Sequence, residues 1–400
     1  MNKNYDICAG AKRLENVKFS PIRQVLDKAA EMRNNGIDVI SLSVGEPDFN
    51  TPEMIKKKTI ESIQNNDTHY GSHRGLPELR NLISDDFYKE NNVRYDWNTE
   101  VVFTTGGAEA LNNVILATVN KDDEVIVFSP AFVSYKNLVN LCGGKCIELP
   151  LKPENDYIPD IKELENVITD KTKMLIMNNP NNPTGAVYPA EVLGKIAKLA
   201  ISNNFLILAD EMYSKLVYEG DFVSMASLPN MKEHVIIVNG FSKTYAMTGW
   251  RLGYLLADSR IVTNIMKVHQ YSSTCSPTFI QKGMAAAIKK NETEADVQNM
   301  IKQFKLRRNV LINELNNIEK IKFVEPKGAF YVLIDVSATG LNGEEFAARL
   351  LKDEHVAVVP VVSMGKDKVY DDYIRISFAA SEDNIRNGIR AIGRLVDSMK

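Results

Sequence analysis

Cysteine is scarce in this chain. Its 400 residues include four cysteines, Cys8, Cys142, Cys146 and Cys275, too few to predict a disulfide framework. Cys142 and Cys146 flank Gly-Gly-Lys, a spacing that does not fit a zinc ribbon, and no second pair of this kind follows. We therefore expect neither a disulfide-stabilised fold nor a metal site.

A surplus of positive charge and long apolar runs are also missing. Lysine and arginine total 48 against 51 aspartates and glutamates, a net charge of −3, which argues against nucleic acid as a partner. No uninterrupted apolar run approaches the length of a membrane-spanning helix, and residues 1–6 lack the apolar core of a signal peptide. We expect a cytoplasmic protein that does not bind a membrane.

Short apolar runs and helical apolar patterns follow one another along most of the chain. Strands are predicted at 39–42, 101–105, 124–128, 145–149, 174–177, 205–209, 235–238, 322–325, 329–335, 356–359 and 373–378. Helices are predicted at 21–35, 52–65, 77–90, 109–119, 133–142, 160–167, 258–270, 277–289, 293–317, 343–353 and 383–399. No internal repeat or low-complexity linker interrupts them, and the length predicts two or three domains.

The segment after strand 235–238 carries the strongest chemical signal. Lys243 lies at the end of this strand, where open α/β sheets bind ligands. A lysine that is desolvated there loses its proton near neutral pH and can attack a carbonyl group. Arg251 is close enough in sequence to hold an anionic group of the same ligand. The alternative is a solvated surface lysine beside a structural arginine.

A second candidate site is the glycine-rich turn after strand 101–105. Gly106, Gly107 and Ala108 precede a helix, so free backbone amides and the positive end of the helix dipole meet there and favour an anion. Glycine pairs alone are weak evidence for such a site. The sequence G-x-G-x-x-G is absent from this turn, which counts against a dinucleotide-binding fold.

Two charged residues lie within or directly after apolar strands. Asp210 follows strand 205–209, where a buried carboxylate is costly unless it is paired; an N-cap role is the alternative. Arg375 interrupts the apolar strand 373–378, and a buried arginine needs an acidic partner. That partner is either a ligand carboxylate or a structural salt bridge.

The residues around Lys243 resemble a known motif. S-K-x-x-x-M-T-G-W-R-x-G at 242–253 is similar to the cofactor-lysine segment of pyridoxal-phosphate (PLP) aminotransferases of fold type I, class I/II. Further motifs resemble the same family in the same order: G-E-P-D-F at 45–49, Y-x-x-x-x-G-L-P-E-L-R at 70–80, N-P-x-N-P-T-G at 179–185 and P-x-G-A-F-Y at 326–331. Each of these alone is also compatible with an ordinary turn or capped loop.

The resemblance implies an α/β fold of the type-I class. A large domain, expected at residues 46–295, holds a mostly parallel seven-stranded sheet. A small domain combines the N-terminal arm, 1–45, with residues 296–400. The resemblance further implies a homodimer and cis peptide bonds at Ser129-Pro130 and Asn182-Pro183, each of which aims a side chain into the site.

Roles for individual residues also follow from the resemblance. Lys243 binds PLP covalently and then transfers a proton as general base and acid, Asp210 pairs with the ring nitrogen, and Tyr213 reaches the ring hydroxyl. The expected cofactor contacts are Gly107, Ala108, Phe132 (stacked on the ring), Asn182, Asp210, Tyr213, Ser242, Lys243, Arg251 and, from the neighbouring subunit, Tyr70. The expected substrate contacts are Gly45, Asn182, Arg375 (on the α-carboxylate) and Arg74.

The implied reaction moves an amino group from an L-amino acid to a 2-oxo acid, with 2-oxoglutarate as the expected acceptor, in ping-pong order. The chain resembles the bacterial and archaeal branch that contains aspartate, aromatic and broad-range enzymes. Ala108 stands where some aspartate enzymes of that branch carry a lysine, and Phe132 lacks the indole N–H of the tryptophan in many of them. Strict aspartate specificity is therefore not expected, and Arg74 is the hypothetical partner of a distal carboxylate.

Two other functional classes fit the same motifs. A PLP-dependent β-lyase uses the same lysine, aspartate and arginine, because the pocket selects which bond breaks. A non-enzymatic regulator with an aminotransferase-like domain is the second class. Such regulators usually carry an added DNA-binding module, and the roughly forty residues before the first motif leave no room for one.

Overall fold

The computed structural model of the chain describes residues 10–399 except 16, 18, 20, 290–292, 363, 366 and 367. Its helices are α1 Pro21–Asn34, α2 Glu53–Gln64, α3 Pro77–Asn91, α4 Gly107–Thr118, α5 Ser134–Leu141, α6 Ile161–Val167, α7 Ala190–Ser202, α8 Ser259–Ser272, α9 Thr278–Lys289, α10 Glu294–Leu315, α11 Gly343–Glu354 and α12 Glu382–Asp397. Its strands are β1 Ile40–Ser41, β2 Val101–Thr104, β3 Glu124–Ser129, β4 Lys145–Pro150, β5 Thr172–Asn178, β6 Leu206–Asp210, β7 Val235–Gly240, β8 Gly253–Leu256, β9 Lys322–Phe323, β10 Tyr331–Asp335, β11 Val356–Ala357, β12 Val359–Pro360 and β13 Tyr373–Ser377.

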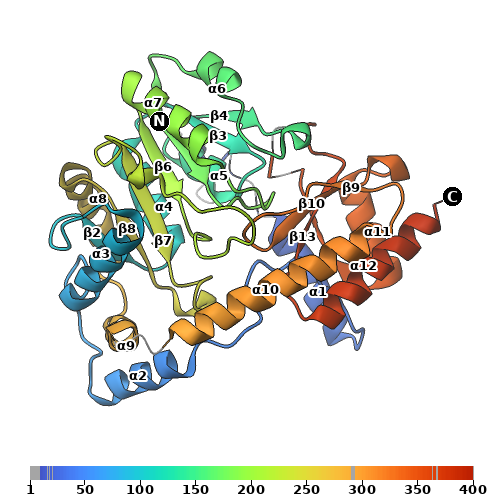
Figure 1. Cartoon of the computed structure of the whole chain (residues 1–400), viewed down its shortest axis with the longest axis horizontal. Coiled ribbons are helices and arrows are strands. Elements are labelled where there is room, and N and C mark those ends of the chain that lie inside the picture. Colours follow the sequence, from blue (N-terminus) through green and yellow to red (C-terminus); the bar gives the residue numbers. More distant parts are fainter. Residues whose placement is uncertain are drawn as a thin grey trace, which may run out of the picture.

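The largest sheet has seven strands in the order β2-β8-β7-β6-β5-β3-β4. All neighbouring pairs from β7 to β4 are parallel, while β8 runs antiparallel to both β7 and β2. The expected mostly parallel seven-stranded sheet is therefore confirmed. Figure 1 shows this sheet with helices on both of its sides.

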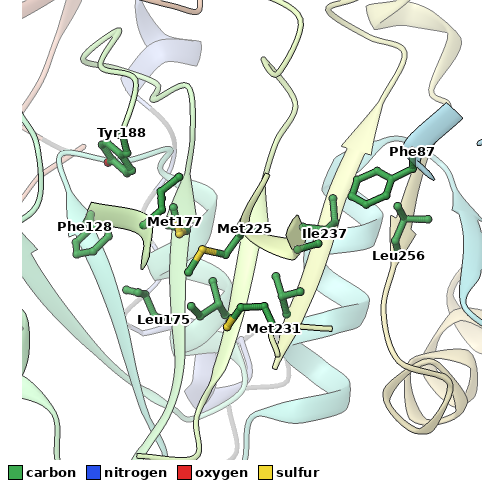
Figure 2. Close-up of a cluster of buried hydrophobic side chains, with 14 of the residues drawn as sticks. Phe87, Phe128, Leu175, Met177, Tyr188, Met225, Met231, Ile237 and Leu256 are labelled. Carbon is green, nitrogen blue, oxygen red and sulfur yellow. The ribbon is translucent and has the colours of Figure 1, made fainter. Parts of the chain in front are cut away.

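Alternating residues of the strands face the two helical layers, which explains why the strands are apolar throughout. In β7, Val235 and Ile237 belong to the core shared with α3, α7 and α9, whereas Ile236 and Val238 belong to the core shared with α4, α5 and α8. Figure 2 shows the first core, with Ile237 near Phe87 of α3. Parallel sheets that are buried on both faces have such continuous apolar strands.

A second, smaller part of the molecule surrounds the four-stranded antiparallel sheet β12-β13-β10-β9. Its core joins this sheet to α10, α11 and α12, and includes Leu42 from the N-terminal segment. Strand β1 pairs with β11, so both ends of the chain enter this part. Helix α10 extends from the α9 end of the large part to the α11–α12 side (Figure 1). The exact boundaries at 45/46 and 295/296 stay a prediction.

Three elements differ from the expected ones. Helix α7 was not predicted, although Leu193, Ile196, Ala197 and Ala200 are buried at helical spacing. Strand β8 was not predicted either, because its four residues directly follow the lysine motif and begin with a glycine. The run 356–359 splits, since β11 pairs with β1 while β12 pairs with β13. No helix in the described part of the chain is long and apolar enough to cross a membrane.

Candidate active site

A pocket of about 290 Å³ opens at the carboxyl ends of the parallel strands, the usual ligand position in such sheets. It collects residues that are far apart in the sequence. The predicted site residues that line it are Gly45, Gly107, Ala108, Phe132, Asn182, Asp210, Tyr213, Ser242, Lys243, Arg251 and Arg375. Tyr70 and Arg74 are the two predicted residues that do not line it.

Lys243 lies in the turn that follows β7, and its amine faces the loop after β1. Nζ donates a hydrogen bond to the backbone oxygen of Gly45 at 2.6 Å. Burial lowers the pKa of this amine to about 8; Arg251 and Arg375 lower it further, while Glu46 and Asp210 oppose the shift. A substantial fraction of the amine is therefore neutral and nucleophilic near neutral pH.

The loop after β1 is fastened to the lysine segment at two further points. Oγ1 of Thr51 donates to the backbone oxygen of Ala246 at 2.8 Å. Oγ1 of Thr248 donates to the Glu46 carboxylate, also at 2.8 Å. Both contacts are made by the five residues that follow Lys243, so they hold this turn against the loop after β1.

One end of the pocket is suited to an anion. Gly106 adopts a φ of 78° and precedes α4, whose first residues are Gly107 and Ala108, so their amides are free of helical partners. A Cβ on Gly106 would lie 2.4 Å from Nη2 of Arg251. Glycine thus allows the guanidinium to lie against this turn, and Ser242 lines the same pocket. Amides and a guanidinium together match a phosphate group.

Another wall holds a buried carboxylate. Asp210 accepts a hydrogen bond from the hydroxyl of Tyr135 at 2.7 Å and from the backbone N–H of Met212 at 3.1 Å. Burial raises the pKa of Asp210, and these two donors, with Lys243, partly offset that shift. The Met212 contact is a turn contact two residues along the chain, and no helix of the described residues begins directly after Asp210, so the N-cap alternative is not borne out. Asp210 also lines the pocket, where its carboxylate suits a cationic ring nitrogen.

Arg375 reaches the pocket from β13 with incomplete hydrogen bonding. Nη1 donates to Oδ1 of Asn182 at 3.2 Å, and Nη2 donates to the backbone oxygen of Ser43 at 2.8 Å. Nε is buried and has no partner among the described residues. The guanidinium carbon lies 4.6 Å from the ring centroid of Tyr331. In the described part of the chain no carboxylate forms a salt bridge with Arg375, which leaves the guanidinium for a ligand carboxylate.

Turns with cis prolines shape the remaining wall. The bonds Ser129-Pro130 and Asn182-Pro183 are cis, which confirms the expectation, and Asn179-Pro180 is also cis, which was not expected. The backbone N–H of Asn182 donates to Oδ1 of Asn178 at 2.7 Å. Phe132 packs edge-to-face on Tyr135, with 5.7 Å between the ring centroids.

Sequence reasoning missed some of the lining residues. Tyr135 is three residues after Phe132, and no motif marked its hydroxyl as the partner of Asp210. Tyr331 was noted only as part of a turn, yet its hydroxyl hydrogen-bonds that of Tyr213 at 3.0 Å. The other residues not assigned to the pocket were Leu111, Asn178, Met212 and Thr248.

Tyr70 and Arg74 lie on a loop outside the pocket. The side chain of Tyr70 is 88% exposed in the single chain. Nη1 of Arg74 donates to the backbone oxygen of Thr99 at 2.8 Å, and burial lowers the pKa of the Arg74 guanidinium. Their expected roles require a second subunit and stay predictions.

A second hollow, of about 460 Å³, lies between α3 and the end of β7. It holds Glu211, a carboxyl group whose pKa burial raises to about 8. Each lysine that lines it is paired with a carboxylate: Lys89 with Asp86, Lys215 with Glu90 and Lys289 with Glu78. The lysine with the lowered pKa, Lys243, therefore lies in the first pocket and not in this one.

Comparison with known proteins adds a family context. The profile described as aminotransferase class I and II matches residues 37–392. An aspartate aminotransferase of Pyrococcus abyssi is 39% identical over 98% of this chain and 99% of its own length. The aromatic-amino-acid aminotransferase 2 of Thermococcus litoralis is 38% identical over 97% of this chain and 98% of its own length. The structure of aspartate aminotransferase from Thermus thermophilus with maleate matches with a TM-score of 0.92 and 36% identity, covering 97% of this chain and 99% of that one.

The lowered pKa of Lys243 makes a prediction about its reactivity. In protein freed of small ligands, the labelling rate of Lys243 by an amine-selective reagent is expected to reach half its maximum near pH 8, because the neutral amine is the reactive form. Mass spectrometry of the Lys243 peptide across a pH series measures this rate, with the peptide of exposed Lys145 as the reference for the reagent. A midpoint near the ordinary lysine value of 10.5 contradicts the desolvated amine.

Proposed function

Because the chain belongs to the class I and II aminotransferases, it is a PLP-dependent aminotransferase, and we propose how its own residues divide the work. Its substrates are an amino acid and a 2-oxo acid. Amino-group transfer in ping-pong order is favoured over a β-lyase reaction, because the relatives are named as aminotransferases. The observation that carries the assignment of roles is one pocket lined by Lys243, Asp210 and Arg375.

The pocket walls fit the cofactor. The amides of Gly107 and Ala108 and the guanidinium of Arg251 form the phosphate end, which exists because Gly106 has no Cβ. Asp210 is the counter-charge for the protonated ring nitrogen, and burial alone makes that carboxylate costly without one. When bound, PLP draws electrons from the substrate and makes the hydrogen on its Cα acidic.

The neighbouring polar residues complete the cofactor contacts. Ser242, directly before the lysine, adds a hydroxyl to the phosphate end. Phe132, Asn182 and Tyr213 line the same pocket. Phe132 is the proposed aromatic face for the ring, and Asn182 and Tyr213 are the proposed hydrogen-bond partners of its hydroxyl oxygen. Tyr331 holds the hydroxyl of Tyr213 at 3.0 Å and so restricts its orientation.

Lys243 acts first as nucleophile and then as proton carrier. Its lowered pKa provides the neutral Nζ that attachment to the cofactor aldehyde requires. Once an amino acid has released this nitrogen, Nζ would take the proton from the substrate Cα as general base and deliver it to C4′ of the cofactor as general acid. The hydrogen bond to Gly45 keeps Nζ at the pocket in the absence of substrate.

Arg375 is the proposed anchor of the substrate α-carboxylate. Its unpartnered, buried Nε and the adjoining N–H groups offer the two parallel donors that a carboxylate accepts. Asn182 holds Nη1 and Tyr331 lies under the guanidinium, so the fork is pre-oriented. The backbone of Gly45 borders the same end of the pocket.

We expect a homodimer in which Tyr70 contributes to the neighbouring site. The strong exposure of Tyr70 in the single chain is compatible with such a contact. A cytoplasmic location and the amino donor likewise stay predictions.

The assignment of Lys243 is tested by chemical fixation. Wild-type protein incubated with PLP and then with borohydride is expected to retain a pyridoxyl group on the Lys243 peptide, whereas Lys243→Ala retains none. Peptide mass spectrometry measures this. In the wild type, addition of an amino acid is expected to bleach the cofactor band and release one 2-oxo acid per site.

Two results contradict this assignment. Fixation at another lysine excludes Lys243 as the attachment point. Release of pyruvate with ammonia, without a pyridoxamine spectrum, indicates a β-lyase.

Arg74 provides a test of side-chain selection. Among the relatives are aspartate, aromatic and aspartate/prephenate aminotransferases, and Ala108 offers no cation. If Arg74 of the neighbouring subunit meets a distal carboxylate, Arg74→Ala lowers kcat/KM for aspartate and glutamate by about tenfold or more, the cost of a hydrogen bond to a charged group. Phenylalanine turnover is expected to remain near the wild-type value.

The same variant contains its own control. Because Arg74 also donates to Thr99 within its chain, a structural role predicts an equal loss for all donors. Equal losses, or no loss for aspartate, contradict the distal-carboxylate role.

Tyr135 is expected to keep Asp210 ionised. Its hydrogen bond lowers the pKa of Asp210, so Tyr135→Phe raises that pKa and shifts the acid limb of the activity profile to higher pH. Loss of a hydrogen bond to a charged group predicts a fall in kcat/KM of about ten- to a hundredfold. Kinetics from pH 5 to 9 measure both effects.

Tyr218→Phe is the matched control, because it removes a buried hydroxyl that donates to a backbone oxygen, that of Ala329. An unchanged acid limb in Tyr135→Phe, or the same shift in Tyr218→Phe, contradicts the role of Tyr135.

A further inference from the structure

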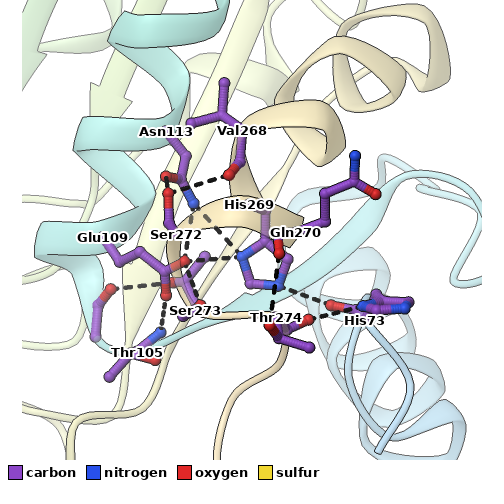
Figure 3. Close-up of polar contacts among 12 residues, drawn as sticks. His73, Thr105, Glu109, Asn113, Val268, His269, Gln270, Ser272, Ser273 and Thr274 are labelled. Atoms are coloured by element: carbon purple, nitrogen blue, oxygen red, sulfur yellow. Dashed lines mark hydrogen bonds and ion pairs between the residues drawn. The ribbon is translucent and has the colours of Figure 1, made fainter.

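A buried polar cluster surrounds the first turn of α4 (Figure 3). Glu109, the third residue of that helix, accepts hydrogen bonds from the backbone N–H of Thr105 at 2.5 Å and from Nδ2 of Asn113 at 2.9 Å. Oγ of Ser273 donates to the same carboxylate at 2.7 Å. Burial raises the pKa of Glu109, but hydrogen bonds from His269, Ser273 and Thr105 outweigh it and lower that pKa to about 2.

His269 faces an oxygen acceptor with each ring nitrogen. Nδ1 lies 2.8 Å from Oε1 of Glu109, and Nε2 lies 2.8 Å from the backbone oxygen of His73. Nδ2 of Asn113 also lies 3.5 Å from Nδ1. The side chain of His269 is fully buried. Both ring nitrogens are thus engaged, Nδ1 with the Glu109 carboxylate and Nε2 with the backbone of His73.

The backbone oxygen of His73 belongs to loop 69–75, which carries Tyr70. This loop is held to the α8–α9 region by further contacts. Nδ1 of His73 lies 2.9 Å from the backbone oxygen of Thr274, and Oγ1 of Thr278 donates to the backbone oxygen of His69 at 2.9 Å. His269 is thus a side chain that connects the start of α4 to the loop of Tyr70.

We propose that His269 is a positioning residue that joins the phosphate-binding first turn of α4 to loop 69–75. The inference rests on the proposed function, in which the amides of Gly107 and Ala108 bind the phosphate of their own subunit and Tyr70 binds that of the neighbour. The pair Glu109–His269 then connects the phosphate sites of the two subunits. Neither residue touches substrate, so neither is catalytic.

Core packing alone does not require a polar cluster at this position. Apolar residues of similar volume would fill the same space without the cost of burying polar groups. Instead, four hydrogen-bonding groups contact the Glu109 carboxylate. The bond from Thr105 fixes the chain immediately before Gly106 and Gly107. A shift of His269 would therefore move the amides of the anion site and the Tyr70 loop together.

The test compares His269→Gln with His234→Gln. His234 also approaches a backbone oxygen, that of Phe205, but lies outside the cluster, so it reports the general effect of replacing a histidine. For each variant we measure the dissociation constant of PLP by absorbance titration of the cofactor-free protein. The melting temperature of the cofactor-free protein is measured in parallel.

His269→Gln is expected to raise the PLP dissociation constant about tenfold, the factor that loss of one hydrogen bond gives. Glu109→Gln is expected to do the same, and the double variant to weaken PLP no more than either single one, because the pair acts as a unit. Unchanged PLP affinity in His269→Gln, or additive losses in the double variant, overturn the proposal. A wild type that binds no PLP refutes the proposed function itself, which is a different outcome.

Hybrid dimers test the path through the loop. One subunit carries Lys243→Ala and cannot retain a pyridoxyl group after borohydride, and the other has Lys243 intact. His269→Gln placed in the Lys243→Ala subunit is expected to reduce pyridoxyl fixation in the intact subunit, because Tyr70 crosses between them. Unchanged pyridoxyl fixation in the intact subunit, or a chain that forms no dimer, overturns the connection through loop 69–75.

Discussion

The withdrawal of one amine from water constrains the rest of the site. Nζ of Lys243 has a pKa near 8 chiefly because it is buried at the end of β7, and it donates to the backbone of Gly45. Holding that oxygen in place requires the loop after β1, which Thr51 and Glu46 fasten to the lysine segment. The same loop is anchored to α10 by the ion pair of Asp48 and Arg307. The reactivity of one side chain therefore depends on contacts between both parts of the molecule.

The buried charges of the pocket are stabilised mainly by neutral groups. Asp210 is held by a tyrosine hydroxyl and a backbone amide, and Arg375 by an amide oxygen and a backbone oxygen. Such dipoles hold a charge in place but do not cancel it, so each group still gains from an ionic ligand. A direct ion pair between the two would satisfy the folded chain and remove its affinity for charged ligands. Binding strength is thus obtained at the expense of folding stability.

The sequence predicted the residues whose chemistry is unusual for their local pattern. Lys243 and Asp210 follow apolar strands and Arg375 interrupts one, so each was visible without a structure. Tyr135 and His269 were not visible, since an aromatic or a histidine on an amphipathic helix is ordinary, and their partners are far away in the sequence. Hydrogen bonds between residues far apart in the sequence produce no periodic pattern in it. Helix α7 was different, because its buried positions have clear helical spacing that could have predicted it.

The antiparallel strand β8 explains why Lys243 and Arg251 serve the same pocket. The chain leaves β7 at the carboxyl edge of the sheet, passes through Lys243 and re-enters directly at β8, whose Gly253 pairs with both Gly240 and Thr104. A parallel strand would first require a crossover to the opposite edge, and would carry Arg251 there. The reversal instead leaves Arg251 beside Gly106, and a Cβ on Gly253 would lie 2.7 Å from the amide nitrogen of Gly107. One change of strand direction thus brings Lys243 and Arg251 to the same pocket.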